Sequence, residues 1–174
     1  MNWTQFLNKE IETIYGTAEK LMGQVDPASL AWKPATGSNW MTVGQLLRHL
    51  TDACGAPAKA LVTGDWGLPD GRKYEDLPPE ELFPTAEKLP SAASVEEARR
   101  LLLDDKTLAL KMIELAGEEN LAGKQVAAPW SPAEPHALGW QIFQMVLHLD
   151  RHKSQLFYYL KLQGKPLGTL DLWS

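Results

Sequence analysis

Two of the four histidines in the sequence, His148 and His152, are separated by four residues. On an α-helix this spacing places both imidazoles on one side, with Cβ atoms about 5–6 Å apart, so that they can share one metal ion. Both lie on an apolar stripe formed by Met145, Leu149 and Leu156. Buried imidazoles need polar partners or a metal, because an unsatisfied polar group is costly in a protein core. The pair therefore predicts a metal site that faces the protein interior.

A third histidine, His49, lies on another apolar stripe, three residues after Leu46 and four before Ala53. Three neutral imidazoles from two facing helices would form a nitrogen-donor site for zinc, nickel, iron or copper. Such a site keeps at least one position open, which is typical of catalytic sites. The alternative is that these histidines are core residues satisfied by polar neighbours. His136 follows Pro135 away from the stripe, and we leave it out of the predicted site.

Four polar residues next to these histidines could support the site. Asp52, three residues after His49, could orient an imidazole or accept a proton, and a solvated carboxylate is the alternative. Gln155 could serve in a similar way at the edge of the site. Arg48 and Arg151, each adjacent in sequence to a histidine, could bind an anionic cosubstrate, or could be ordinary exposed arginines.

Motifs of several other enzyme classes are missing. The segment from His148 to His152 has no glutamate after its first histidine, unlike the helix of zinc proteases that carries its own general base. The chain has no P-loop and no G-x-S-x-G motif, and its helical stripes carry no carboxylate pair of the di-iron type. These absences argue against a zinc protease, a kinase, a serine hydrolase and a ferritin-like protein.

The composition is that of an ordinary, mildly acidic globular protein. The 174 residues include 17 Lys plus Arg and 22 Asp plus Glu, a formal net charge of −5, and 44% are hydrophobic. Without a basic cluster we expect no nucleic-acid partner. Cys54 is the only cysteine, which excludes an intramolecular disulfide and favours a small core residue over a fourth ligand. With no signal-peptide pattern and no apolar run of about 20 residues, we expect a cytoplasmic protein without a membrane partner.

Apolar residues recur at helical spacing in four segments. These segments span residues 3–25, 43–62, 95–116 and 138–160. Thr42 with Gln45 and Ser94 with Glu97 form capping boxes, and Pro57 is expected to kink the second helix or to mark where its last turn is rebuilt. No segment alternates in the manner of a β-strand. The sequence therefore predicts an all-α fold, a four-helix bundle, in a single domain over residues 1–174.

Two connections separate these helices. Residues 63–93 contain five prolines together with Trp66, Tyr74 and Phe83, which excludes long regular structure but supplies apolar anchors. A connection of this length is a candidate lid, binding loop or partner contact, and a plain surface connection is the alternative. Gly117 is expected to end the third helix, and residues 118–135 are expected to form a loop.

Three segments, taken in order, resemble the DinB/YfiT-like family of bacterial four-helix-bundle metalloproteins. They are Trp32-Lys33-Pro34, the stretch Met41-Thr42-Val43-Gly44-Gln45-Leu46-Leu47-Arg48-His49-Leu50, and His148-Leu149-Asp150-Arg151-His152-Lys153-Ser154-Gln155-Leu156 with Tyr159, Leu160 and Gly164. The resemblance covers nearly the whole chain. It implies that His49, His148 and His152 hold a divalent metal, often zinc or nickel, in a protein that is commonly a homodimer.

The same family is similar to thiol-dependent transferases, including bacillithiol and mycothiol transferases and a maleylpyruvate isomerase. We therefore expect a low-molecular-weight thiol to bind at the metal, which stabilises its thiolate and presents it to a small electrophile. The same open site could instead lower the pKa of water and catalyse hydrolysis. A non-catalytic metal-binding stress or binding protein is the third interpretation.

Overall fold

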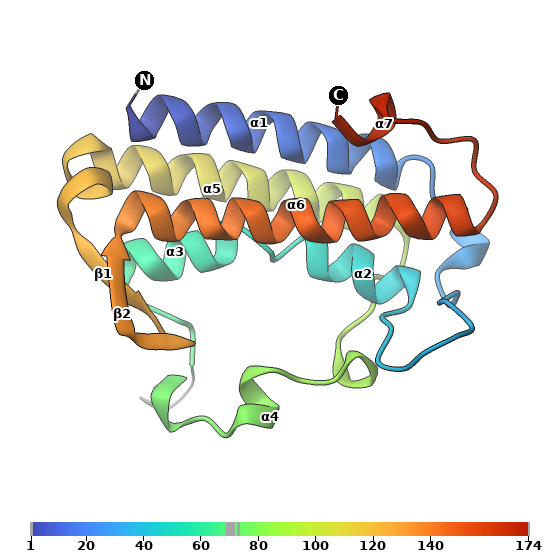
Figure 1. Cartoon of the computed structure of the whole chain (residues 1–174), viewed down its shortest axis with the longest axis horizontal. Coiled ribbons are helices and arrows are strands. Elements are labelled where there is room, and N and C mark those ends of the chain that lie inside the picture. Colours follow the sequence, from blue (N-terminus) through green and yellow to red (C-terminus); the bar gives the residue numbers. More distant parts are fainter. Residues whose placement is uncertain (1, 69–71, 73, 174) are drawn as a thin grey trace.

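The structure, a computed structural model, describes residues 2–68, 72 and 74–173. This part of the chain is mostly helical and contains a small two-stranded sheet (Figure 1). The helices are α1 (Trp3–Met22), α2 (Val43–Leu50), α3 (Gly55–Thr63), α4 (Pro79–Leu82), α5 (Val95–Gly123), α6 (Leu138–Leu162) and α7 (Leu170–Trp173), and the strands are β1 (Gln125–Ala128) and β2 (Ser131–Ala137). None of the described helices is long and apolar enough to cross a membrane.

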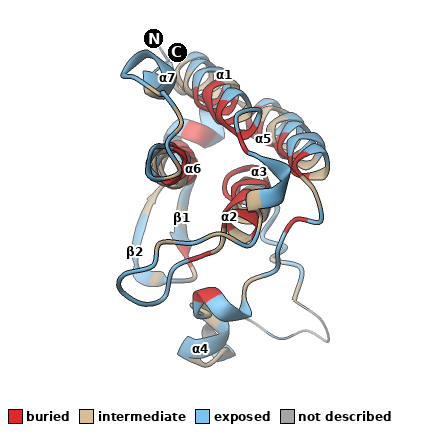
Figure 2. Cartoon of the chain, turned by 90° about the vertical axis from the view of Figure 1, so that its right-hand side faces the viewer, coloured by how far each residue is buried: buried red, intermediate tan, exposed pale blue. Residues whose placement is uncertain are grey.

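Three long helices and the α2–α3 pair form the core. α1 packs against both α5 and α6, while α2 and α3 lie end to end and contact α5 and α6 from the other side (Figure 1). The buried positions of these helices face one another around a common interior (Figure 2). Fully buried side chains on the four predicted stripes include Leu7, Leu47, Leu102 and Leu149. The helical periodicity in the sequence therefore identified the buried faces.

Side-chain caps fix where the principal helices begin. The capping box of α2 is complete: the Gln45 backbone N–H donates to Thr42 Oγ1 over 3.2 Å, and the Thr42 N–H donates to Gln45 Oε1 over 2.8 Å. At α5 only half of the predicted box forms. Ser94 Oγ accepts the Glu97 N–H over 3.0 Å, but the Glu97 carboxylate accepts the N–H of Ala93 rather than that of Ser94.

The predicted second helix is two helices, separated by residues 51–54. The expectation of one continuous helix over residues 43–62 was therefore wrong. Pro57 lies in the first turn of α3, and the chain leaves the helical path several residues before it. A proline has no N–H to donate to the carbonyl four residues earlier, which here is that of Ala53. The proline thus marks the start of a new helix rather than a kink within one.

The region after Gly117 also differs from the prediction. Gly117 adopts φ 69° and interrupts α5, as expected for a helix end, but the helix resumes and reaches Gly123. Within the expected loop over residues 118–135, the chain forms an antiparallel hairpin that extends to residue 137, in which Val126 pairs with His136 and Ala128 with Ser131. The all-α prediction therefore needs a correction for this small sheet. Gln141 Nε2 of α6 donates to the Val126 carbonyl over 2.9 Å and attaches the hairpin to α6.

Short turns occupy the proline-rich connection between α3 and α5. They are η3 (Tyr74–Asp76), α4 and η4 (Ala86–Lys88), while residues 69–71 and 73, with Pro69, lie outside the described residues. Gln45 Nε2 of α2 donates to the carbonyls of Ala86 and Leu89 over 2.7 and 3.0 Å. The end of this connection is therefore fastened to the helix that carries His49.

Candidate metal centre

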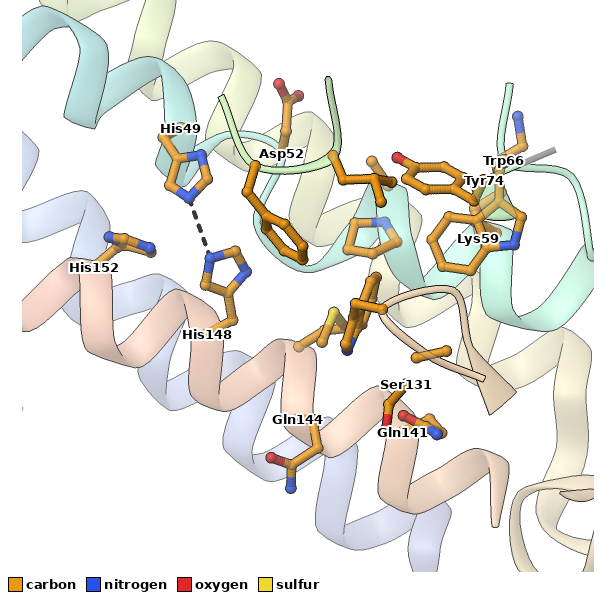
Figure 3. Close-up of a pocket in the computed structure, with 18 of the residues that line it drawn as sticks. His49, Asp52, Lys59, Trp66, Tyr74, Ser131, Gln141, Gln144, His148 and His152 are labelled. Carbon is orange, nitrogen blue, oxygen red and sulfur yellow. Dashed lines mark hydrogen bonds between the residues drawn. The ribbon is translucent and has the colours of Figure 1, made fainter. Parts of the chain in front are cut away.

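The three predicted histidines converge. His49 projects from α2, whereas His148 and His152 project from α6, one helical turn apart. His49 Nε2 lies 3.2 Å from His148 Nε2, and the three potential ligand atoms all lie within 4.8 Å of one another. All three side chains are partly buried. Figure 3 shows the rings directed toward a common point between the two helices.

A chain of hydrogen bonds fixes the orientation of His152. Its Nδ1 lies 3.0 Å from Gln155 Oε1, and because an amide oxygen only accepts, Nδ1 carries the proton and Nε2 keeps the lone pair. Gln155 Nε2 donates to the Tyr159 hydroxyl over 3.1 Å, and that hydroxyl donates to the Met41 carbonyl over 3.0 Å. The suggestion from sequence that Gln155 orients an imidazole agrees with this contact. Tyr159, a buried core residue, extends the chain to the backbone.

The break between α2 and α3 supports His148. The His148 ring has a hydrogen bond to the backbone of Ala53, which lies within that break. Because Pro57 cannot donate an N–H to the Ala53 carbonyl, this carbonyl is left without the usual helical partner. The proline in the first turn of α3 therefore leaves this acceptor available to the His148 ring, and such partners fix the ring orientation of histidines that bind metals.

The histidines are held in their neutral form. Burial, followed by the proximity of His152 and His148, lowers the pKa of His49 to about 4. Burial and the proximity of His152 and Arg151 lower the pKa of His148 to about 4, against an opposing contribution from the Ala53 hydrogen bond. Burial also lowers the pKa of His152. Metals bind the neutral imidazole, so at neutral pH the donors need not lose a proton first.

A buried carboxylate on α5, which the sequence reasoning missed, fixes the start of α3. Asp105 Oδ2 accepts the Gly55 N–H over 2.9 Å, Asp105 Oδ1 accepts the Ala56 N–H over 2.9 Å, and the Tyr15 hydroxyl donates to Oδ2 over 2.6 Å. Burial raises the pKa of Asp105, while these hydrogen bonds oppose that shift. The signal in the sequence was an acidic residue between Leu102 and Ala109 on an apolar stripe.

The other predicted site residues are only partly brought to the histidines. Asp52 and Arg151 line the same cavity as the three histidines, whereas Arg48 does not. Arg48 donates instead to Asp52 and, over 2.6 Å, to Thr51 Oγ1. The Asp52 carboxylate is about half exposed, and its described partner is Arg48 rather than an imidazole.

The histidines form part of the wall of a cavity of about 1030 Å³. Most of the remaining wall comes from α3, α6, the β1–β2 hairpin and the connection that follows α3, with smaller contributions from the segment before α2 and from α5. Small-molecule sites commonly occupy about 300–1000 Å³, so this cavity is at the large end of the range. His136 lines it too, stacked on Trp140 with ring centroids 4.0 Å apart, but it lies outside the histidine group.

Fold and site together define a mostly helical protein with a three-histidine candidate metal centre open to a large cavity. The profile of the DinB superfamily matches residues 10–156, and the chain belongs to this superfamily. The crystal structure of the DinB-like protein YjoA from Bacillus subtilis is similar in fold, with a TM-score of 0.64 and 14% sequence identity over 92% of this chain and 94% of that one. No curated protein matches the sequence significantly.

Proposed function

We propose that this protein is a divalent-metal-dependent transferase that moves a low-molecular-weight thiol onto a small electrophile. The observation that carries the proposal is the convergence of three neutral imidazoles on one wall of a cavity of about 1030 Å³. A cavity of this size has room for two small reactants at once, as group transfer requires. The choice of a thiol as cosubstrate, and of zinc or nickel as the metal, is based on the resemblance to the family.

The donor set fits a divalent ion. Three imidazole nitrogens suit zinc, nickel, copper or iron, and three protein ligands leave a position for an exogenous group. A bound ion would lower the pKa of a thiol or a water that coordinates it. His49, His148 and His152 would hold the ion, and Gln155 and the Ala53 backbone keep two of these rings in place.

Two charged residues on the cavity wall have proposed roles in this reaction. Arg151 would attract an anionic group of the thiol cosubstrate, and Arg48 would act indirectly by holding the carboxylate of Asp52. Asp52 would accept the proton that the thiol loses. We expect Asp52→Asn to lower turnover without changing metal content, a split that a purely structural role would not produce.

The first test is the metal content of purified protein, measured by elemental analysis after incubation with zinc or nickel and removal of free ion. We expect about one ion per chain in the parent protein and a loss of that ion in His148→Ala. His136→Ala is the matched control, because His136 lines the same cavity outside the histidine group, and it should keep its ion. A parent protein without metal affinity would overturn the proposal.

The second test separates transferase from hydrolase. Metal-loaded protein would be assayed with a panel of small thiols and 1-chloro-2,4-dinitrobenzene, where an S–C bond forms and chloride leaves. The comparison is cleavage of p-nitrophenyl acetate without thiol. Metal-dependent conjugation supports the transferase, whereas metal-dependent ester cleavage that ignores added thiol supports the hydrolase. Metal binding with neither activity would support the non-catalytic metal-binding protein.

Three further features belong to the same proposal. The histidines would be held by a four-helix bundle made of α1, the α2–α3 pair, α5 and α6. The chain would work as a homodimer in the cytoplasm. The support is the resemblance to the family and, for the location, a single cysteine that is buried and unpaired. Sedimentation equilibrium of the purified chain measures the assembly, and a mass equal to one chain would refute the dimer.

A further inference from the structure

The cavity has two chemically different ends. The histidines lie at one end, and Trp66, Tyr74 and Lys59 lie together at the other (Figure 3). Trp130, at the tip of the β1–β2 hairpin, lines the cavity as well. We refer to Trp66, Tyr74 and Trp130 as the aromatic cluster.

The aromatic cluster joins segments that are distant in sequence. Trp66 follows α3 and Tyr74 lies in η3, with ring centroids 5.0 Å apart and planes at 68°. Trp66 also meets Trp130 of the hairpin, with centroids 5.8 Å apart and planes at 85°. These are edge-to-face contacts, the favoured geometry of aromatic pairs. The rings therefore hold the proline-rich connection against the hairpin and line this end of the cavity.

The aromatic surface in the cavity is not fully covered by protein. Trp130 is 43% exposed and Phe83, which also lines the cavity, is 66% exposed. Trp140 contributes a further partly exposed ring. Apolar surface left open in a concave site is typical of ligand binding. Rings that meet edge to face leave other ring faces and edges free for a flat ligand.

The charges around the cavity favour a neutral ligand. Lys59 and Arg151 are basic, while Asp52, Asp65 and Glu134 are acidic. With both signs present, the wall gives no strong preference for an anion or a cation at the aromatic end. Neutral ring systems gain from aromatic contacts without the cost of losing a hydrated charge.

We propose that the aromatic cluster binds the electrophile of the transfer reaction through a flat, uncharged aromatic or conjugated ring system. This inference rests on the proposed function for its role in catalysis, because the ligand would then lie in the cavity that the histidines share. The binding itself depends only on the rings. The acceptor class would be aromatic or conjugated apolar molecules rather than sugars, phosphates or aliphatic chains.

The test is the binding of 1-naphthol to the full chain, measured by isothermal titration calorimetry. We expect saturable binding with one site per chain, and weaker binding of decahydro-1-naphthol, which keeps the ring skeleton but has no aromatic face. Trp130→Leu should weaken 1-naphthol binding about two- to tenfold, the size expected for loss of aromatic contacts. Tyr74→Leu is the second variant, should Trp130→Leu fail to fold as judged by circular dichroism.

Trp173→Leu is the matched control, because Trp173 is 69% exposed on α7 and does not line the cavity. It should bind 1-naphthol as the parent does. Equal binding of the aromatic and saturated ligands, or equal effects of Trp130→Leu and Trp173→Leu, would overturn the inference, as would the absence of saturable binding. His148→Ala separates the two proposals: 1-naphthol binding that survives metal loss supports the aromatic site, whereas metal binding without 1-naphthol binding refutes only this inference.

Discussion

Gly55→Ala should damage the joint that connects α2 to α3. Gly55 begins α3, and its N–H donates to the buried Asp105 carboxylate over 2.9 Å. A Cβ at this position would collide with the Asp105 backbone oxygen and would lie 2.6 Å from Asp105 Oδ1. Since the first obstacle is backbone, α3 and α5 must move apart, and the hydrogen bond to Asp105 lengthens or breaks.

The expected loss of stability follows from three contributions. Overpacking a core costs about 1–3 kcal/mol. Loss of a hydrogen bond to a charged group costs about 1.5–3 kcal/mol. Alanine recovers about 0.5–1 kcal/mol relative to glycine within a helix. The free energy of unfolding should therefore fall by about 2–5 kcal/mol, which lowers the melting temperature of a chain of this size by about 5–15 °C.

Urea and thermal unfolding of the metal-free protein, followed by circular dichroism, would measure this loss. Gly16→Ala is the matched control, because Gly16 lies within α1 and a Cβ there meets nothing within 4 Å; it should raise stability by about 0.5–1 kcal/mol. Zinc affinity should also fall in Gly55→Ala, since the joint carries the Ala53 backbone that contacts His148. If Gly55→Ala proved as stable as Gly16→Ala, the role assigned to the joint would be refuted.

Two further predictions concern the histidines. Gln155→Ala should weaken zinc or nickel binding about 10–100-fold, the usual effect of removing a partner that orients a ligand. Ser154→Ala loses only a hydrogen bond to the Asp150 carbonyl and should bind the metal as the parent does. A competition titration with a chelating dye measures both affinities, and equal affinities of the two variants would contradict the orienting role. The second prediction concerns pH. Folding lowers the pKa of His49 and His148 from about 6.5 to about 4, so between these pH values the unfolded chain binds protons that the folded chain does not. The stability of the metal-free protein should therefore decrease as pH falls from 6.5 toward 4. Urea unfolding in the presence of a chelator, repeated at several pH values, measures this decrease. In His148→Gln the free energy of unfolding should fall less steeply with decreasing pH, and an unchanged pH dependence would count against this account.

The sequence predicted the group of three histidines because their positions follow from local rules. A spacing of four on one helix, with both residues on the apolar stripe, was enough to pair His148 with His152, and the phase of His49 directed it to the same interior. The three do meet. The position of the break before α3 could not be read in this way. Leu50, Ala53 and Cys54 continue the apolar pattern through it, and the break depends on Asp105, about 50 residues later in the chain.

The hairpin escaped prediction for a different reason. Its second strand, Ser131–Ala137, contains two prolines and is largely exposed, so it shows neither the alternation nor the β-branched residues that mark strands. Contacts with α6, such as that between Gln141 and Val126, help to hold it. The aromatic cluster could not be predicted either, since nothing local in the sequence brings Trp66 to Trp130.

The sequence distance between the histidines sets the order in which the candidate site can form. His49 and His148 lie 99 residues apart, and α6 supplies two of the three imidazoles. A ribosome releases the N-terminal segments first, so α1 to α5 emerge while His49 still lacks the two histidines of α6. The three-histidine group can therefore form only after α6 has docked, and loading of the proposed metal would have to follow the slow closure of these long-range contacts.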